Sequence, residues 1–293
     1  MSISQAGAQS RSLIKRSIKI SAALAVIKIV AGLATGSLGV LASALDSVLD
    51  ITASAVNYFS LDFAQLPPDK THPYGHGKVE ALAGLFQGAF IAASGLALLA
   101  ESLRRMVSGS ELQAASIAIG AMAASMAMSA WHARNLRQDA ASSGSTVMKT
   151  ERAHFAVDVL SNGAVLAALI AAYVTGKSVW DLLISVGVTA YILREAFIIL
   201  LDCVRELMDH GLSPERLGGV ERAIREHHCA LVGFHDLRTR KSGGRVFIDC
   251  HIELRGVRLF REAHDITESL VDKIETLIPG SDVTIHFDPE GER

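Results

Sequence analysis

Ionisable side chains occur in pairs within two long apolar stretches of the sequence, where a lipid-facing helix would exclude them. Asp46 and Asp50 lie four residues apart in one stretch, and His154 and Asp158 have the same spacing in another. Side chains at i and i+4 project from one face of a helix. Each charged group at the centre of a membrane helix costs about 2.5–3.5 kcal/mol on insertion scales, so such groups pair, meet water or bind an ion.

These four side chains form a ligand set for a divalent cation. Two helices that each offer two ligands one turn apart can enclose one ion, and imidazole with carboxylates suits a borderline ion such as zinc. The polar faces continue through Ser43, Ser47, Ser54 and Asn57 on the first stretch and Ser161 and Asn162 on the second. The alternatives are that Asp46 caps a helix or pairs with Lys28 and that His154 only packs between helices. Two such pairs on two helices favour the metal site.

A second group of candidate ligands lies in PPDKTHPYGHGKVE, residues 67–80. Asp69, His72 and His76 fall within eight positions, and the surrounding prolines and glycines oppose a helix. Together they could hold zinc, with a fourth ligand from water or from elsewhere in the chain. The alternative is a solvated turn with two surface histidines.

Seven of the eleven histidines lie after residue 204. The candidate ligands in this region are His235, His251, His264, His286 and Asp288. His286 and Asp288 are two residues apart, so they share one face of a strand. His264 stands at the start of an expected helix and the others on or near neighbouring strand ends, which indicates a shared site.

The elements that must position these ligands divide the chain into an apolar part and a charged part. Half of the residues are apolar, 20% are charged, and the mean hydropathy is +0.33. Residues 1–204 hold 15 Lys and Arg against 13 Asp and Glu, a formal +2, whereas residues 205–293 hold 13 against 17, a formal −4. This step predicts a transmembrane domain at 1–204 and a soluble domain at 205–293. The net charge of −2 gives no indication of a nucleic-acid partner.

Six stretches approach the roughly 20 apolar residues that a membrane-spanning helix needs. They cover residues 17–35, 38–62, 80–104, 113–134, 151–174 and 178–202. An even number of spans places both termini on one side. Apart from Lys28 and Arg194, which lie deep within spans, the first 204 residues hold 13 Lys and Arg at the span ends or between spans, and ten of them lie on that side. Because positive charge marks the cytoplasmic side, both termini and the soluble domain are expected in the cytoplasm.

The soluble part predicts a small α/β domain of order α-β-β-α-β. Helices are expected at 214–228 and 261–278, and strands at 231–240, 245–255 and 282–287. Ser213 and Pro214 resemble the cap and first position of a helix, and the glycines of KSGG at 241–244 indicate a hairpin. Alternating apolar residues in the second strand predict helices packed on one face of the sheet.

The sequence motifs resemble those of a known family. The chain is similar to cation diffusion facilitators, and among them to the bacterial zinc and iron efflux subgroup, over about residues 12–290. The stretches that carry it are GSLGVLASALDSVLD at 36–50, PPDKTHPYGHGKVE at 67–80, HFAVDVLSN at 154–162, and HDLRTRKSGG, HIEL and IHFDP in the soluble part.

The resemblance implies a six-helix transport domain and a cytoplasmic, metallochaperone-like domain that binds metal and dimerises. The family's transport site matches Asp46, Asp50, His154 and Asp158, its loop site matches Asp69, His72 and His76, and its dimer-interface site matches His235, His251, His264, His286 and Asp288. Lys78 and Asp209 match a charged interlock between the membrane parts of two protomers. Phe287 stands between two of these ligands, where relatives can have a polar residue.

The implied function is efflux of a divalent metal by proton antiport, in a homodimer in a bacterial inner membrane, and not an enzymatic reaction. Zinc is the expected cargo and regulatory ion, with cadmium or ferrous iron as alternatives, because His154 supplies a nitrogen ligand. The competing interpretation is a membrane-anchored metal sensor or scaffold that recruits partners without transport, which would not need the polar stripes. A passive channel would need only weak sites.

Overall fold

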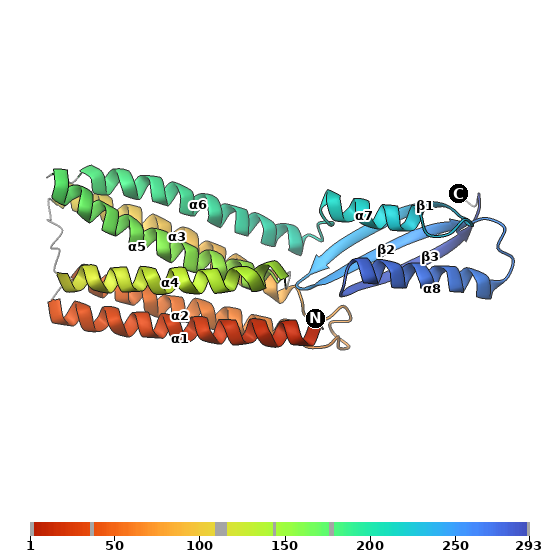
Figure 1. The fold of residues 1–293 in the computed structure, drawn as a ribbon, viewed down its shortest axis with the longest axis horizontal. Helices are drawn as coiled ribbons and strands as arrows, with labels where there is room; N and C mark the ends of the chain where they lie inside the picture. Colours follow the sequence, from red (N-terminus) through yellow and green to blue (C-terminus); the bar gives the residue numbers. More distant parts are fainter. Residues whose placement is uncertain (1–2, 36–37, 109–115, 143–144, 176–178, 292–293) are drawn as a thin grey trace. The chain divides into compact units, whose positions relative to one another are not determined.

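The computed structural model describes residues 3–35, 38–108, 116–142, 145–175 and 179–291. The chain divides into two compact units, Met1–Val204 and Arg205–Arg293. The first is built from long helices, and the second contains a sheet (Figure 1).

The helices of the first unit follow the predicted spans in order. They are α1 Ile3–Thr35, α2 Leu38–Ala64, α3 Val79–Ser108, α4 Ser116–Ser142, α5 Thr146–Thr175 and α6 Val179–Leu207. α2 contacts α1, α3 and α5, and α5 also contacts α3 and α4. The two polar stretches of the sequence, in α2 and α5, are therefore neighbours inside the bundle.

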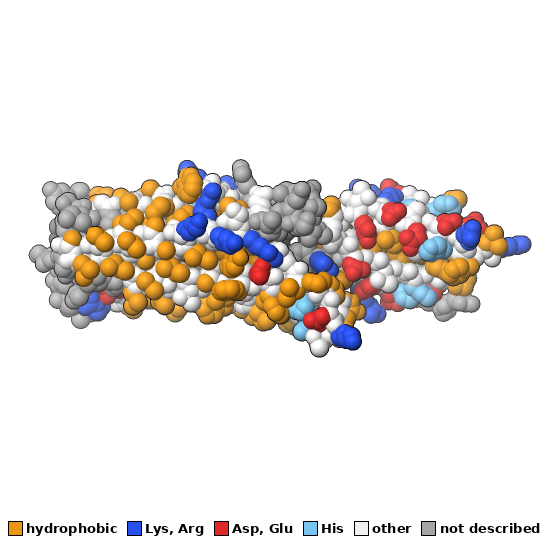
Figure 2. Space-filling model, turned by 90° about the horizontal axis from the view of Figure 1, so that it is seen from below, with side chains coloured by type: hydrophobic (Ala, Val, Ile, Leu, Met, Phe, Trp, Pro, Cys, Tyr) orange, Lys and Arg blue, Asp and Glu red, His pale blue; other side chains and the backbone are white. Residues whose placement is uncertain are grey.

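Apolar surface covers this helical unit. Within the described residues, Gln9–Ala34, Val79–Arg104 and Leu183–Leu207 are long and apolar enough to cross a membrane by length and composition alone. Figure 2 shows hydrophobic side chains along much of the helical unit, together with a group of Lys and Arg, whereas most of the acidic side chains in this view lie on the C-terminal unit. Continuous apolar surface of this kind fits contact with lipid.

Small residues hold α3 close to α6. A Cβ atom at Gly84 would lie 2.5 Å from the sulfur of Cys203, and one at Gly88 would lie 3.0 Å from Leu200. Glycine at both positions lets the two backbones approach, as in other membrane-helix interfaces.

A buried glutamate fixes the beginning of α5 against α3. Glu80, in the first turn of α3, accepts hydrogen bonds from the Ser145 hydroxyl and from the backbone N–H of Val147, the latter at 3.4 Å. A carboxylate at a helix N-terminus satisfies backbone donors and the helix dipole. This contact places the first turns of α5, which precede His154.

The C-terminal unit is a three-stranded sheet with two helices, in the predicted α-β-β-α-β order. The elements are α7 Pro214–Arg225, β1 Leu231–Ser242, β2 Arg245–Leu254, α8 Phe260–Leu277 and β3 Ser281–Pro289. The strand order is β1-β2-β3, with β1 antiparallel and β3 parallel to β2. Ser213 stands at the N-cap of α7, but its side chain makes no capping hydrogen bond, so Pro214 carries the helix-start signal.

The sheet has one apolar face and one polar face. Ile248 and Ile252 of β2 are fully buried in a core that includes Ile224 of α7 and Leu270 of α8. Because side chains alternate along a strand, His251 and its odd-numbered neighbours in β2 project to the opposite face. The helices cover the first face and leave the second for the predicted ligands.

Candidate metal centre

Three of the four predicted transport ligands meet between α2 and α5. The Nε2 atom of His154 lies 3.3 Å from Oδ1 of Asp50 and 3.9 Å from Oδ2 of Asp158. One ligand atom from each of the three residues lies within 4.8 Å of the others. Asp46 belongs to α2 one turn before Asp50, and its side chain lies outside the described residues.

The imidazole at the centre of this cluster is buried and has an unused nitrogen. His154 is 2% exposed, between the rings of Phe90 and Phe155, whose centroids lie 6.0 Å and 5.5 Å from its own. Its Nε2 atom makes no hydrogen bond of acceptable geometry among the described residues, although Asp50 is near. A buried nitrogen beside two carboxylates suits a cation as the missing partner.

The polar stripe of α2 continues on both sides of Asp50. Lys28 of α1 donates a hydrogen bond to Ser47 at 2.9 Å, which provides a partner for this buried lysine. In the other direction, Ser54 and Asn57 contact Glu151 of α5. Glu151 was not among the ligands predicted from the sequence, although it lies three residues before His154 and on the same helical face.

The loop between α2 and α3 brings its three predicted ligands together. Oδ1 of Asp69 lies 3.3 Å from Nδ1 of His72, and Oδ2 lies 3.3 Å from Nε2 of His76. His76 is buried against Phe63, with ring centroids 4.8 Å apart, whereas His72 is exposed. The burial of His76 argues against a turn with two solvated histidines.

Hydrogen bonds organise the carboxylate of this loop. Asp69 accepts from the hydroxyl and the backbone N–H of Thr71, each at 2.8 Å, and from the backbone N–H of His72 at 2.6 Å. The hydroxyl of Thr71 and then the N–H of His72 hold the pKa of Asp69 well below its usual value of 3.8. The loop therefore presents an ionised carboxylate to its histidines.

We expect metal binding at this loop to weaken as the solution is made acidic, because metal requires neutral histidine. Asp69 adds nothing to this dependence, since a lowered pKa keeps its carboxylate ionised until the pH is well below 3.8. Zinc titration of the full-length protein carrying Asp50→Asn and Asp288→Asn measures it. A zinc affinity that stayed constant between about pH 7 and pH 5 would contradict the histidine ligands.

The third cluster lies on the polar face of the sheet. His235, His251 and His286 are directly opposite one another on β1, β2 and β3. Asp288 joins all three: its Oδ2 lies 3.0 Å from Nδ1 of His251 and 3.5 Å from Nε2 of His235, and its Oδ1 lies 3.1 Å from Nε2 of His286. The hydrogen bond from His251, with the nearby imidazoles, lowers the pKa of Asp288.

The cluster differs from the sequence-based prediction at two residues, His264 and Glu253. His264 is exposed on α8, which packs on the opposite face of the sheet, so within one chain it does not join the other ligands. Oε1 of Glu253 lies 3.4 Å from Nδ1 of His235 and adds a carboxylate that the sequence analysis missed. Its position two residues after His251, on the same strand face, is the signal that could have found it.

We expect Asp288→Asn to weaken zinc binding at the sheet by at least about tenfold, because the carboxylate contacts three imidazoles and orients them. Calorimetric titration of the full-length protein with Asp50→Asn and Asp69→Asn measures this affinity. Asp282→Asn is the matched control, since Asp282 is exposed on the same face of β3, outside the cluster. Equal affinities of the Asp288 and Asp282 variants would refute the assignment.

The two residues of the predicted interlock lie near the ends of membrane helices. Lys78 immediately precedes α3, and Asp209 follows α6 with a left-handed φ of 56°. Oδ1 of Asp209 lies 3.9 Å from the guanidinium of Arg240. Their contact across a dimer remains a proposal.

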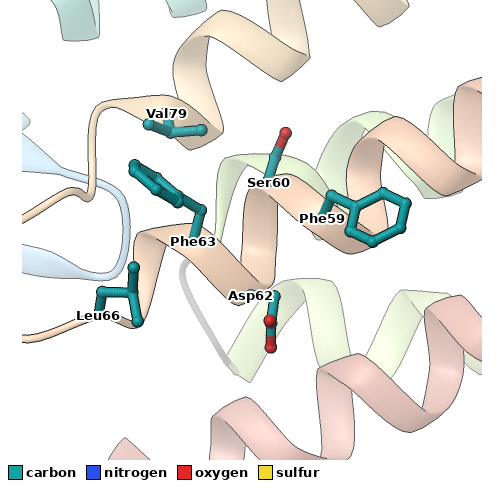
Figure 3. Close-up of a pocket in the computed structure, with 6 residues that line it drawn as sticks. All are labelled: Phe59, Ser60, Asp62, Phe63, Leu66 and Val79. Carbon is teal, nitrogen blue, oxygen red and sulfur yellow. The ribbon is translucent and has the colours of Figure 1, made fainter.

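An open cleft of about 380 Å³ lies at the loop end of α2 (Figure 3). It is lined by Phe59, Ser60, Asp62, Phe63, Leu66 and Val79. None of these residues is a predicted ligand, and Phe63 is the ring that packs on His76. The cleft is thus a neighbour of the loop cluster and separate from the cluster between α2 and α5.

Each of the two structural units matches a known protein domain. Residues 14–208 match the cation efflux transmembrane domain, and residues 212–290 match the cytoplasmic domain of cation efflux proteins. The cation-efflux pump FieF of Yersinia pestis (strain Pestoides F) is 33% identical over 270 residues, which cover 92% of this chain and 89% of the relative. FieF of Yersinia pseudotuberculosis serotype I (strain IP32953) gives the same values.

Among solved structures, a chain of CzrB, described there as a candidate zinc transporter, is 34% identical to this protein. The match covers 100% of the CzrB chain and 28% of this chain, with a TM-score of 0.27. The two family domains together extend from residue 14 to residue 290. The chain belongs to the cation diffusion facilitator family and is a cation-efflux transporter of the membrane.

Proposed function

We propose that this protein exports zinc from the cytoplasm in exchange for protons. The observation that carries the proposal is the buried His154, whose unpaired Nε2 faces the carboxylates of Asp50 and Asp158 between two membrane helices. One nitrogen with carboxylate oxygens suits zinc, and it also suits cadmium or ferrous iron better than magnesium or calcium.

The same residues supply the exchange. Metal binding requires ionised carboxylates and a neutral imidazole, so a cation that reaches Asp46, Asp50, His154 and Asp158 displaces protons from them. After the helices open to the other side, protons return to His154 and a carboxylate and weaken their hold on the metal. Histidine serves this step because imidazole changes its charge near neutral pH.

The same proposal includes the orientation of the protein in the membrane, the role of the sheet cluster and the dimer. Lys and Arg on the side of the termini support a cytoplasmic location for both ends in a bacterial inner membrane. The sheet cluster would sense cytoplasmic zinc in a homodimer, with His264 contributing across the interface. Filling of that cluster would tighten the dimer and favour transport, and the pair of Lys78 and Asp209 would hold the membrane parts together.

Reconstituted vesicles with an imposed pH gradient test the proposal. We expect zinc flux that depends on the gradient, accompanied by proton movement in the opposite direction, when zinc and internal pH are followed together. Zinc flux without proton movement would overturn the exchange. No flux of any divalent metal, with zinc still bound at the sheet, would favour a sensor or scaffold instead.

A further inference from the structure

A buried polar cluster lies next to the transport ligands and joins three helices. The carboxylate of Glu151 on α5 accepts hydrogen bonds from Ser54 at 2.7 Å and from Asn57 at 2.5 Å, both on α2. The amide of Asn57 also donates to Oε1 of Gln87 on α3 at 3.3 Å. All four side chains are fully buried, so solvent does not satisfy them.

The cluster lies between the loop end of the bundle and the transport ligands. Contacts between α2 and α5 run antiparallel: Asp50 meets His154, whereas Ser54 and Asn57, later in α2, meet Glu151, earlier in α5. α2 ends at the loop that precedes α3. A cation that moves inward from the loop end would therefore pass Glu151 about one helical turn before it reaches His154.

The cluster lacks positive charge and leaves polar atoms unpaired. Glu151 forms no ion pair among the described residues, and its hydrogen bonds come from neutral donors. The Oδ1 atom of Asn57 and the Nε2 atom of Gln87 are buried without a hydrogen-bond partner in the part of the chain that the structure describes. A buried carboxylate is costly unless a cation compensates it, and an unpaired amide oxygen beside it is a further ligand.

We propose that Glu151, Ser54, Asn57 and Gln87 form a transit site that holds the divalent cation before it moves to the transport ligands. The inference rests on the proposed function, because it needs Asp50, His154 and Asp158 as the next site. The donors of the transit site are carboxylate, hydroxyl and amide oxygens. Oxygen ligands without imidazole or thiolate hold zinc less tightly than a site with histidine, so the ion passes onward.

Replacing Glu151 with glutamine distinguishes a role in binding the cation from a role in holding the helices together. Glutamine has the size of glutamate, and rotation of the Asn57 amide would turn its unpaired oxygen toward the new NH₂ group. The Gln87 amide can rotate in the same way and donate through its unpaired nitrogen. Glu151→Gln thus removes the charge and leaves each amide with a partner.

The test measures initial zinc flux into vesicles at zinc concentrations below half-saturation, for Glu151→Gln, Glu151→Asp and Glu101→Gln. We expect Glu151→Gln to lower the flux at least about tenfold, while zinc affinity of the transport ligands changes less than about threefold. Affinity is measured by equilibrium zinc titration of each variant with Asp69→Asn and Asp288→Asn added. Glu151→Asp should recover at least about half of the flux. Glu101→Gln is the matched control, since Glu101 is partly exposed and paired with Arg104 at the far end of α3.

Flux within about twofold of wild type in Glu151→Gln would overturn the transit site. Equal losses of flux and of equilibrium affinity would also overturn it, since Glu151 would then only position the transport ligands. In both of these cases, normal zinc flux in the wild-type protein leaves the proposed function intact. A wild-type protein without zinc flux would instead overturn the proposed function and the transit site with it.

Discussion

Loss of the imidazole at position 154 should abolish the exchange of metal for protons. His154 supplies the nitrogen of the cluster, and imidazole is the side chain that changes charge near pH 7. We expect His154→Ala to lower zinc-dependent proton movement at least about a hundredfold. Removing one partner from a buried set of charged groups costs about 3 kcal/mol or more, which corresponds to a change of this size. Simultaneous recording of zinc and internal pH in vesicles measures it.

A second buried histidine provides the control for this prediction. His132 of α4 is fully buried and shares a hydrogen bond of 2.7 Å between its Nε2 atom and the Ser17 hydroxyl. His132→Gln keeps a polar group at that position and should retain coupled exchange. Unchanged coupling in His154→Ala would show that another group carries the protons.

Asp50→Asn should have the next largest effect. The carboxylate lies 3.3 Å from Nε2 of His154, and an amide of the same size removes its charge. We expect zinc flux to fall at least about a hundredfold, because loss of one partner from a buried charged pair costs about 3–5 kcal/mol. Flux measured over a range of zinc concentrations separates weaker binding from slower turnover.

The control for Asp50 lies on the same helix. Asp62 is half-exposed near the end of α2 and forms an ion pair of 2.9 Å with Arg11. Asp62→Asn should leave flux within about twofold of wild type, as expected for a surface ion pair of small energy. If Asp50→Asn transported zinc as well as Asp62→Asn, the cation would have to bind elsewhere.

The order of elements could be predicted because it depends on local signals. Apolar runs locate membrane helices, and alternation locates the strands of the soluble unit. The helix ends were less predictable: α1 begins at Ile3 rather than at residue 17, and Ser10, Ile14 and Ser17, ahead of or at the start of the predicted span, are buried. α5 begins at Thr146 rather than at residue 151, where Glu80 of α3 provides the cap. Tertiary contacts of this kind leave no trace in hydropathy.

The candidate ligands were predictable where spacing along one helix or strand places them on a common face. The pair of His154 and Asp158 and the pair of His286 and Asp288 are examples. Glu151 was missed because its partners, among them Asn57 and Gln87, come from other helices. It is also the first residue of the predicted span 151–174, where a charged side chain is ordinary.

X-ray absorption at the zinc edge tests the central claim most directly, namely that the cargo binds between α2 and α5. The full-length protein would carry His76→Ala and His251→Ala, so that zinc occupies the remaining cluster. We expect one nitrogen and otherwise oxygen ligands at about 2.0–2.2 Å, with the nitrogen lost in His154→Ala. Two or more nitrogens, or a spectrum that His154→Ala leaves unchanged, would contradict it.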